Sequence, residues 1–519
     1  MRCSGRFDLA LSLLRQEVAA ADLLPKRYAR YRPLLADGLW FFLQRLSPVR
    51  VRRIIAEQSQ LPPSASTAER VVALLHHSPA LHKLGQVVAR DRRLDIGFRK
   101  RLQQLESLEP RTRASNVVRL LEKEFKGWRT TGIELGPEAL AEGSVAVVMP
   151  FTWRGADVRE SREGVFKLLK PGVEERLEED LRILVSLGDF LDEDCLRYHL
   201  PELDYRGTFD TIRELLLHEI RLDEEQRHLA EAANAYASVP SVVVPGVLPF
   251  CSPRLTAMTR IHGEKIAGDV PPKGCSPRIL ARSAAEILVA QPMFSSHPAA
   301  LFHGDPHAGN LLVTPDGRLG ILDWSLAGRL RKRDRIELVQ LILGALALDA
   351  GRTGLAVENL TQKTFDRTAL KSVLHSSLRE LRRGTAPGIA WLTRLLDDLV
   401  VRARARFDAD LMLFRKSLFT LDGVLADLAE AEDAGRALLD EVLLTLFVQR
   451  LSAEWPERFR AQFHSRSFRT HLSTADLFSI LWSAPATYAH WWNGTWSDLL
   501  DTAAPVATNT IRSRWAPAP

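Results

Sequence analysis

The sequence predicts an α+β fold in which a small β-sheet lobe precedes a mainly helical lobe, with a helical extension before both. Apolar residues recur at helical spacing up to about residue 126, short β-branched runs dominate from 144 to 263, and helical spacing returns after 275. We expect four segments: a helical extension (1–130), a small lobe that ends in a hinge (131–262), a helical lobe (263–440) and a helical, aromatic-rich tail (441–519).

The composition excludes several classes of protein. Hydrophobic residues make up 46% and charged residues 26% of the 519 residues, which does not fit a disordered chain, a collagen-like fibre or a polytopic membrane protein. The net charge of +6 is modest, and no zinc-finger, RNA-binding or basic-zipper signature is present, so we expect no nucleic-acid partner. The four cysteines lie far apart, which argues against a disulfide or zinc framework and favours the cytoplasm.

Short apolar runs predict the strands. Residues 144–151 and 163–170 flank a polar turn, which is typical of two paired strands. Residues 238–250 predict a further strand pair broken by prolines, and residues 255–263 predict one more strand. In the helical lobe, residues 301–324 predict a loop followed by two strands around a Pro-Asp-Gly turn.

The tail is rich in aromatic residues, although no apolar run approaches the roughly 20 residues of a membrane-spanning helix. These aromatic residues are Trp482, Tyr488, Trp491, Trp492 and Trp496. Two interpretations are open. The side chains lie at a membrane interface without crossing it, or they pack among the C-terminal helices, which is the simpler interpretation.

The strongest chemical signal is an Asp, an Asn five residues later and a second Asp across the hairpin: Asp305, Asn310 and Asp323. Asp305 on a loop can accept a proton from a hydroxyl nucleophile or orient it. Asn310 and Asp323 offer hard oxygen ligands for Mg²⁺, which neutralises charge on a transferring phosphoryl group. A turn or cap role would explain any one of these residues, but the set at this spacing predicts a phosphotransfer site.

Two lysines need partners if they are buried. Lys167 lies inside an apolar strand, where an unpaired charge is unfavourable. Glu231 is the favoured partner, because it lies on a predicted helix between this strand and the next, and Glu219 and Glu225 compete with it. The alternative is a lysine that reaches solvent at a sheet edge. Lys83 lies on a mostly apolar helix face, and a solvated helix lysine is its simpler interpretation.

Five further segments, with the motif around Asp305, resemble the UbiB/AarF/ADCK family of atypical kinases, which is tied to ubiquinone and other isoprenoid-quinone metabolism. They are HKLGQ (82–86), ALAEGSVA (139–146), KLLKPG (167–172), MTRIHG (258–263) and LFRKSLFTLDG (413–423). They resemble, in order, the family's Lys-x-Gly-Gln helix, its alanine-rich loop, its nucleotide-binding lysine strand, its hinge and a late helix. Each segment is weak alone, but their order and spacing are specific. The resemblance implies a protein kinase-like bilobal fold.

The resemblance also implies roles for individual residues. Asp305 and Lys167 would be catalytic, with Lys167 contacting the ATP phosphates and pairing with Glu231, while Asn310 and Asp323 would bind Mg²⁺. The other nucleotide-site residues implied are Ala139, Ala141, Gly143 and Ser144 over the phosphates, Met258 and Ile261 at the adenine, and Lys83 and Gln86 on a helix over the active site. The implied cofactors are ATP and Mg²⁺. The implied partners are isoprenoid lipids or quinone-biosynthesis proteins, at the inner face of an anionic membrane that the protein touches peripherally.

Two departures from the family pattern generate expectations of their own. Trp324 and Ser325 stand where Phe and Gly follow the metal-binding Asp, so we expect Trp324 to fill the pocket of that Phe. Glu142 replaces an alanine of the loop, and its charge near phosphates is favourable only if it points outward or toward a cation.

Two other functions compete with the kinase or ATPase interpretation. A small-molecule phosphotransferase of the aminoglycoside or choline kinase type has similar motifs around residues 303–305 and 323–324, but the Lys-x-Gly-Gln segment and the alanine-rich loop do not belong to that group. A nucleotide-binding pseudokinase scaffold is the second alternative. The presence of Asp305, Asn310 and Asp323 together disfavours it.

Overall fold

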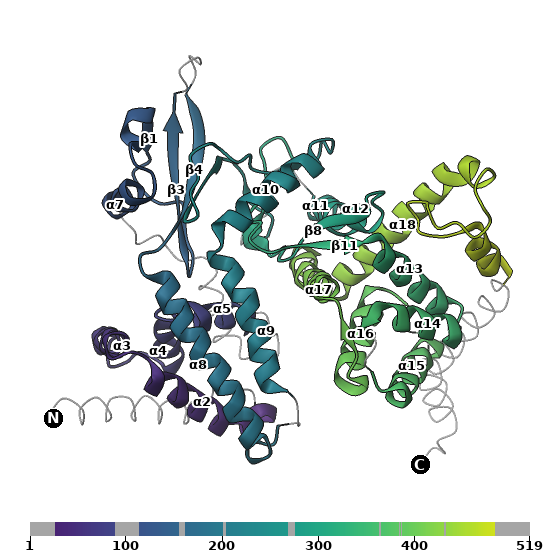
Figure 1. Ribbon diagram of the computed structural model, residues 1–519, viewed down its shortest axis with the longest axis horizontal. Coiled ribbons are helices and arrows are strands. Elements are labelled where there is room, and N and C mark those ends of the chain that lie inside the picture. Colours follow the sequence, from purple (N-terminus) through teal and green to yellow (C-terminus); the bar gives the residue numbers. More distant parts are fainter. Residues whose placement is uncertain are drawn as a thin grey trace, which may run out of the picture. The chain divides into compact units, whose positions relative to one another are not determined.

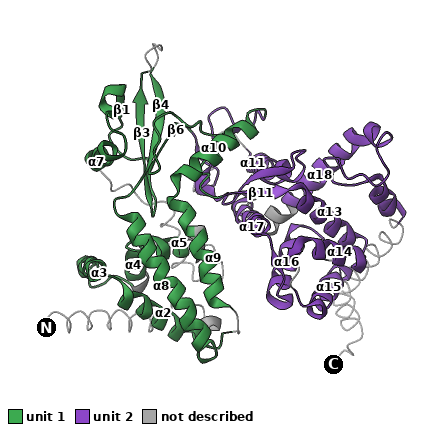
Figure 2. Cartoon of the chain, in the orientation of Figure 1, with its two compact units in different colours: residues 1–238, 243–262, 321–326 green, residues 239–242, 263–320, 327–519 purple. Residues whose placement is uncertain are grey.

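The chain forms two compact units, coloured separately in Figure 2. Unit 1 comprises residues 1–238, 243–262 and 321–326, and unit 2 comprises the remainder. The computed structural model describes residues 26–88, 114–154, 161–200, 204–267, 276–362, 365–383, 385, 387–429 and 432–482. The unit boundary after His262 follows the segment that the sequence predicts as a hinge.

Unit 1 combines a helical bundle with a small sheet. Its helical segments are η1 (Lys26–Tyr31), α2 (Arg32–Arg45), α3 (Pro48–Gln60), α4 (Thr67–Leu75), α5 (Pro79–Val88), α7 (Ala114–Glu124), η3 (Trp128–Thr131), α8 (Val173–Asp194), η4 (Cys195–Tyr198), α9 (Tyr205–Leu217), η5 (His218–Ile220) and α10 (Leu222–Tyr236). Helices α8 and α9 run side by side (Figure 1). Phe42, Ile54, Leu74 and Leu181 belong to the buried core between α8 and the first helices. Each such side chain stabilises the fold by about 1.5–3 kcal/mol, so this core holds α5 in place.

The sheet of unit 1 has the order β1-β3-β4-β6, with β2 beside β3. Its strands are β1 (Ile133–Leu135), β2 (Ala141–Glu142), β3 (Ala146–Trp153), β4 (Arg162–Leu169) and β6 (Leu255–Thr259). Strand β4 is central, because Lys167 pairs with Val148 of β3 on one side and with Thr256 of β6 on the other. The last six residues of β4 are all buried. A lysine in this strand therefore cannot reach bulk water freely.

Aromatic packing fixes the register of β3 against β4. The rings of Phe151 and Phe166 stack with centroids 4.0 Å apart. Gly164, opposite Phe151 in the register, leaves room for that ring, since a Cβ at position 164 would lie 2.5 Å from Phe151 Cζ. A shift of β4 by one residue would turn Lys167 to the other face of the sheet, so this packing also positions the lysine.

Unit 2 is mainly helical. Its helical segments are α11 (Pro277–Ala285), η6 (Glu286–Ala290), α12 (Gln291–Met293), η7 (Ala308–Asn310), α13 (Lys332–Leu346), α14 (Ala350–Leu360), α15 (Arg367–Arg382), α16 (Ile389–Ala403), α17 (Ala409–Ala429) and α18 (Glu432–Arg458). Three small sheets accompany them, with the orders β5-β10-β9-β7, β11-β8 and β12-β13. The strands are β5 (Val242–Val243), β7 (Glu264–Lys265), β8 (Ala299–His303), β9 (Leu311–Val313), β10 (Leu319–Ile321), β11 (Ala327–Arg331), β12 (Thr361–Gln362) and β13 (Arg406–Phe407).

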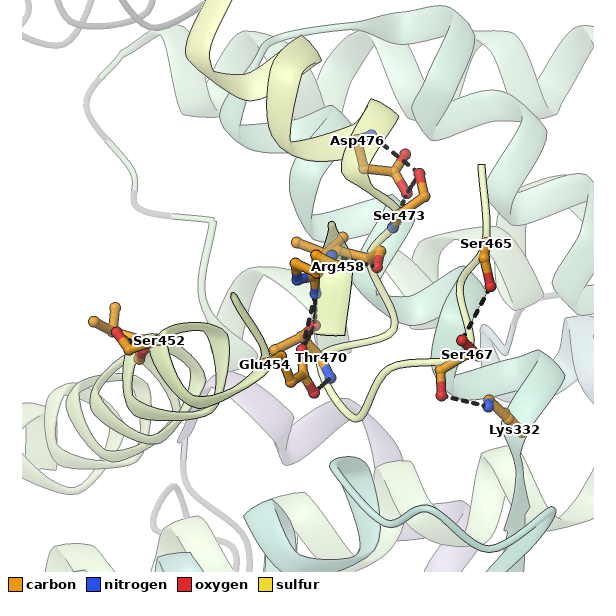
Figure 3. Close-up of polar contacts among 11 residues, drawn as sticks. Lys332, Ser452, Glu454, Arg458, Ser465, Ser467, Thr470, Ser473 and Asp476 are labelled. Atoms are coloured by element: carbon orange, nitrogen blue, oxygen red, sulfur yellow. Dashed lines mark hydrogen bonds and ion pairs between the residues drawn. The ribbon is translucent and has the colours of Figure 1, made fainter. Parts of the chain in front are cut away.

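A buried polar cluster fastens the segment that follows α18 (Figure 3). Arg458, at the end of α18, is 4% exposed and donates to Glu454 Oε2 (2.8 Å), Thr470 Oγ1 (2.6 Å) and the Leu472 carbonyl (3.0 Å). Asp476 accepts from the backbone N–H and the hydroxyl of Ser473. A buried arginine is stable only with its donors satisfied, so these bonds hold residues 470–476 against α18.

The structure confirms the α+β class and most of the predicted strands. Strands β3 and β4 correspond to the runs at 144–151 and 163–170, and β9 and β10 flank the Pro-Asp-Gly turn. The strand pair predicted at 238–250 is wrong in extent, because this stretch contains only the two-residue β5 and an isolated bridge at Val247. Its prolines remove backbone donors that a longer ladder would need. In the described part of the chain, no helix is both long enough and apolar enough to cross a bilayer.

Candidate functional site

A buried lysine with two carboxylates forms the centre of the candidate site in unit 1. Lys167 is 8% exposed, and its Nζ lies 2.8 Å from Glu225 Oε1 and 3.0 Å from Asp323 Oδ2. Glu225 comes from the first turn of α10, and Asp323 follows β10. The Glu225 side chain is 1% exposed, whereas that of Asp323 is 38% exposed. Asp323 is thus the member of the triad that a ligand can reach.

The pairing of Lys167 with Glu231, which the sequence favours, is wrong. Glu225, one of the two competing glutamates, is the partner. Glu231 lies six residues farther along α10, which corresponds to about 9 Å along the helix axis and a different helix face, and its side chain is only half-buried. Amphipathic spacing identifies the helix, but the register between α10 and β4 decides which carboxylate meets the lysine.

Burial and mutual attraction shift the pKa values of Lys167, Glu225 and Asp323 in different directions. Burial alone would lower the pKa of Lys167, but attraction to Asp323 and Glu225 outweighs it and holds that pKa above its ordinary value. Burial would raise the pKa of Asp323, but Lys167 and a hydrogen bond from Ser325 hold it well below its ordinary range. For Glu225, burial dominates and raises the pKa to about 7. Asp323 is therefore an anion at neutral pH, as a metal ligand must be.

A second ion pair adjoins the triad. Lys83 of α5 lies 2.6 Å from Glu219 of η5, and its charge contributes to the low pKa of Asp323. The predicted need of Lys83 for a partner is thus met by Glu219, six residues before Glu225. The side chain of Gln86 lies outside the described residues. These pairs bring the Lys-x-Gly-Gln helix and the start of α10 to the same cluster.

The alanine-rich loop is the turn between β2 and β3. Ala139 is buried, Ala141 pairs with Val148, and the Gly143 N–H donates to the Ala146 carbonyl (2.9 Å). Ala141 and Gly143 are exposed, and Ser144 is half-buried. Glu142 points toward a cation, since its Oε1 lies 2.8 Å from Lys170 Nζ. Its charge is therefore compensated, as its position near the predicted phosphates requires.

The two residues predicted at the adenine occupy different positions. Met258 is buried in β6, opposite Val165 of β4, and it also bridges to Val247. Ile261 lies beyond the end of β6 and is half-buried. Backbone groups outside a sheet are the ones open to a ligand, so Ile261 suits this role better than Met258.

Trp324 occupies a fully buried pocket, as its replacement of Phe suggests. Its ring lies 6.1 Å from that of Tyr236, its Nε1 donates to the Ile321 carbonyl (3.4 Å), and its own carbonyl contacts His228 Nδ1 at 3.2 Å. Tyr236 and His228 both belong to α10. Trp324 therefore anchors the segment that carries Asp323 to the same helix that carries Glu225. Asp323 itself has a left-handed backbone (φ 51°), a strained conformation for a residue other than Gly.

The loop that carries Asp305 and Asn310 lies in unit 2, between β8 and β9. The Asp305 carbonyl accepts from the His307 N–H (2.8 Å) and from Asn310 Nδ2 (3.1 Å), while the Asp305 N–H donates to His303 Nδ1 (3.1 Å). Asn310 is buried and donates through its amide nitrogen, so its amide oxygen is the group that could contact a metal. These bonds fix the backbone of the loop at Asp305 and the side chain of Asn310.

Lys416 is a charged neighbour of Asp305 that sequence reasoning did not assign. It lies on α17, with its Nζ 3.1 Å from Asp305 Oδ1 and 3.4 Å from the Gly304 carbonyl. The adjacent Ser417 donates to the His303 carbonyl (2.7 Å). The signal that could have found Lys416 lies in the segment 413–423. Its Lys-Ser pair lies among apolar residues of a predicted helix, and buried polar side chains need polar partners.

Metal binding by the described residues would need help from a ligand. No group of three or more His, Cys, Asp or Glu side chains among them could hold an ion. The donor set predicted from the sequence, one amide and one carboxylate, suits Mg²⁺, which commonly takes one or two protein oxygens and completes its shell with water and substrate phosphates. The residues fit a metal that arrives with a nucleotide better than a permanent structural metal.

Comparisons with known proteins identify kinase-like relatives. Residues 104–354 match the ABC1 atypical kinase-like domain. A probable protein kinase UbiB from Marinobacter nauticus is 24% identical over 437 residues, which cover 79% of this chain and 74% of that protein. An uncharacterized aarF domain-containing protein kinase of Arabidopsis thaliana, described as chloroplastic, is 32% identical over 206 residues, which cover 37% of this chain and 35% of that protein.

Another relative and one solved structure also match the chain. A probable protein kinase UbiB from Haemophilus ducreyi is 25% identical over 230 residues, and the chain spans 40% of that protein. A solved structure, "The complex structure of Rv3197-erythromycin from Mycobacterium tuberculosis", is 21% identical with a TM-score of 0.45, and the match covers 76% of this chain and 98% of that one.

The buried triad predicts how stability responds to loss of the lysine. In Lys167→Met, Glu225 would be buried without its cation, and unfolding at pH 8 should become easier by about 3–5 kcal/mol. A buried acid with a raised pKa stabilises the fold below its ordinary pKa of 4.5 and loses that contribution as pH rises through the folded value. The defect should therefore shrink at pH 5, as measured by urea unfolding at both pH values.

Two further variants control this prediction. Lys167→Met combined with Glu225→Gln should recover much of the stability at pH 8, because no buried carboxylate is left unpaired. Lys123→Met, at an exposed position on α7, should change little. A defect of equal size at pH 5 and pH 8, with no recovery in the double variant, would refute the buried pairing.

Proposed function

Because the chain belongs to the UbiB/AarF family of atypical, protein kinase-like proteins, we propose that it is an ATP- and Mg²⁺-dependent phosphotransferase or ATPase. The observation that carries the proposal is the buried Lys167–Glu225–Asp323 triad. A lysine held by a helical glutamate is the arrangement with which kinases position nucleotide phosphates. The resemblance to the UbiB family, together with relatives named as probable protein kinases UbiB, supports a role in isoprenoid quinone biosynthesis or related lipid metabolism.

In this proposal, each charge of the triad has one task. Lys167 contacts the α- and β-phosphates, and Glu225 holds the lysine side chain in the direction of the nucleotide. Asp323 would bind Mg²⁺, and the bound ion would neutralise charge on the phosphate oxygens. Asn310, in unit 2, is the second metal ligand that the sequence predicts. The exposed fraction of Asp323, 38%, supports its assignment to the ligand side.

The loop in unit 2 supplies the reacting groups. Asp305 orients the attacking hydroxyl or water and accepts its proton. Lys416, 3.1 Å from Asp305, keeps the carboxylate in one orientation and adds a positive charge beside the group that accepts the proton. The loop itself has no lysine near Asp305, because Pro306 and His307 follow it. The lysine next to Asp305 comes instead from α17.

The remaining predicted residues would complete nucleotide binding. The β2–β3 turn, with Ala141, Gly143 and Ser144, covers the phosphates, and backbone groups near Ile261 hold the adenine edge. The short side chains and the Gly143 backbone allow close approach to phosphate oxygens. The charge of Lys83 adds positive potential at Asp323, and its ion pair with Glu219 holds the side chain in position.

A nucleotide-binding scaffold is a second candidate function. Both carboxylates assigned to chemistry are ion-paired in this structure, Asp305 with Lys416 and Asp323 with Lys167. A protein that binds a nucleotide without turning it over would tolerate such pairs permanently. An enzyme must exchange the Asp323 pair for a metal ion when the nucleotide binds, so turnover separates the two functions.

A peripheral membrane role is supported by an apolar stripe in unit 2. On α18, Leu444, Val448 and Trp455 are between 50 and 64% exposed, and their spacing places them within about 40° of one helix face. Phe459, the first residue after the helix, is 77% exposed. Phe463, Phe478, Leu481 and Trp482 extend this surface beyond the helix and are 50–90% exposed. The stripe is defined here as these eight residues.

We assign a lipid bilayer surface as the occupant of the stripe. Trp and Phe favour the membrane interface, and the exposed Arg460 and Arg469 in the same segment suit anionic headgroups. The chain continues for 37 residues after Trp482 and carries four more aromatic residues in its first fourteen positions. The bonds of Arg458 and Asp476 hold this segment in place, so the aromatic side chains are displayed on a fixed support (Figure 3).

The phosphotransfer proposal predicts ATP turnover that depends on Asp305. Purified protein should release phosphate from ATP and Mg²⁺, and Asp305→Asn should lower the rate by about a hundredfold or more, because general-base catalysis contributes on the order of 10²–10⁴. Asp316→Asn, an exposed turn residue between β9 and β10, is the matched control and should keep its activity. Absence of turnover in the unmodified protein, with ATP binding retained, would favour the scaffold.

The membrane proposal predicts binding to anionic vesicles that depends on the stripe. Phe459→Glu combined with Trp482→Glu should lower co-sedimentation with phosphatidylglycerol-containing liposomes by about tenfold, since each change removes apolar area and adds repulsion. Leu355→Glu, at a 60% exposed position on α14 outside the stripe, is the control. Equal pelleting of all three proteins would support aromatic packing instead.

A further inference from the structure

A basic pocket in unit 1 shares one residue, Ser144, with the nucleotide site proposed above. Its lining residues are Arg50, Arg53, His76, His77, Pro79, Ser144, Lys170 and Arg176. They come from α3, the turn between α4 and α5, the β2–β3 loop, the end of β4 and α8. Lys167, Glu225 and Asp323 are not among them. The cavity measures about 130 Å³, which is room for about four water molecules at roughly 30 Å³ each, or for one phosphate group.

Only part of the positive charge in this pocket is neutralised by carboxylates. Arg50 pairs with Glu179 at 2.9 Å and with Asp180 at 2.6 Å. Lys170 pairs with Glu142 at 2.8 Å, and His77 contacts Glu57. These pairs use the nearby acidic groups and hold Arg50 and Lys170 at the pocket wall.

The guanidinium groups of Arg53 and Arg176 have no hydrogen bond or ion pair to any residue that the structure describes, although the Arg176 carbonyl accepts from Arg50 Nη1 (3.3 Å). Arg176 is half-buried, and its Nε is covered from solvent without an acceptor. Burial, and then repulsion from Arg50 and Arg53, lower the pKa of Arg176, against the opposing attraction of Asp180 and Glu175. A buried donor without an acceptor and a cation among cations are both unfavourable, and an anion in the pocket would relieve both.

A larger hollow adjoins the pocket and shares Lys170 and Arg176 with it. Its other lining residues are Asn116, Arg119, Leu120, Val147 and Pro171. Its volume is about 470 Å³, which falls within the range of about 300–1,000 Å³ typical of small-molecule sites. The two hollows together thus offer a basic end and a roomier end with apolar side chains.

We propose that this pocket binds the phosphate group of a small organic phosphate ester, whose remaining part occupies the adjoining hollow. Arginine guanidinium groups recognise phosphate oxygens with paired N–H donors, and Arg176, which two hollows share, is placed to make this contact. The Ser144 hydroxyl adds a donor from the β2–β3 loop. Occupation would therefore connect the first helices of unit 1 to that loop.

Calorimetric titration of the full chain with glycerol 3-phosphate tests the proposal. The unmodified protein should bind glycerol 3-phosphate. Arg176→Gln should bind it at least about tenfold more weakly, because a charge-assisted contact is lost. Arg182→Gln, an exposed arginine six residues later on α8, should bind as the unmodified protein does. Thermal unfolding without ligand should not be impaired in Arg176→Gln, because its guanidinium has no partner to lose.

Further arms identify the source of the phosphate. Inorganic phosphate alone should bind more weakly than the ester, because it leaves the larger hollow empty. Phosphatidate vesicles that compete with glycerol 3-phosphate would identify a lipid headgroup as the natural ligand, and vesicles that do not compete would identify a soluble ester. No binding by the unmodified protein, unchanged binding by Arg176→Gln, or an equal loss of binding in Arg182→Gln would each overturn the proposal.

Discussion

The burial of Lys167 constrains the rest of unit 1. A charge inside a central strand is tolerated only where carboxylates surround it, and Glu225 and Asp323 meet that requirement from two separate parts of the chain. Helix α10 must begin close to β4 so that Glu225 reaches the lysine. The segment after β10 must return to the same point and adopt a left-handed conformation at Asp323. One unfavourable charge thus specifies where three elements meet.

The surrounding packing makes that meeting point rigid. Trp324 is buried against α10 through Tyr236 and His228, so the residue next to Asp323 and the helix of Glu225 move as one body. The Lys83–Glu219 pair joins the early helices to the start of α10. In unit 2, the bonds around Asp305 and Asn310 fix their loop in the same way, with α17 contributing Lys416 and Ser417. The cluster in unit 1 therefore combines preformed geometry with one exposed carboxylate, which fits the metal-bound phosphate proposed as its ligand.

Local patterns predicted the class of fold, the strands β3, β4, β9 and β10, and the identity of Lys167, Asp305, Asn310 and Asp323 as candidates. Those features depend on short-range signals: alternation of apolar residues, a Pro-Asp-Gly turn, and polar residues in apolar surroundings. The partner of Lys167 could not be predicted, because several glutamates precede and follow the start of α10, and only the register of helix against sheet selects Glu225. Lys416 lies more than a hundred residues from Asp305 in sequence, so no local pattern connects them. The Arg176 guanidinium is identified as unpaired only in the structure, where no acceptor lies near its Nε.

The central claim is that Asp323, held beside Lys167, binds Mg²⁺ together with a nucleotide. Its most direct test is ATP affinity measured calorimetrically at increasing Mg²⁺ concentration, for the unmodified protein and for Asp323→Asn. We expect affinity for ATP to rise with Mg²⁺ in the unmodified protein and to be independent of Mg²⁺ in Asp323→Asn, whose amide is a weaker ligand without charge. The same Mg²⁺ dependence in both proteins would contradict the assignment of Asp323 to the metal.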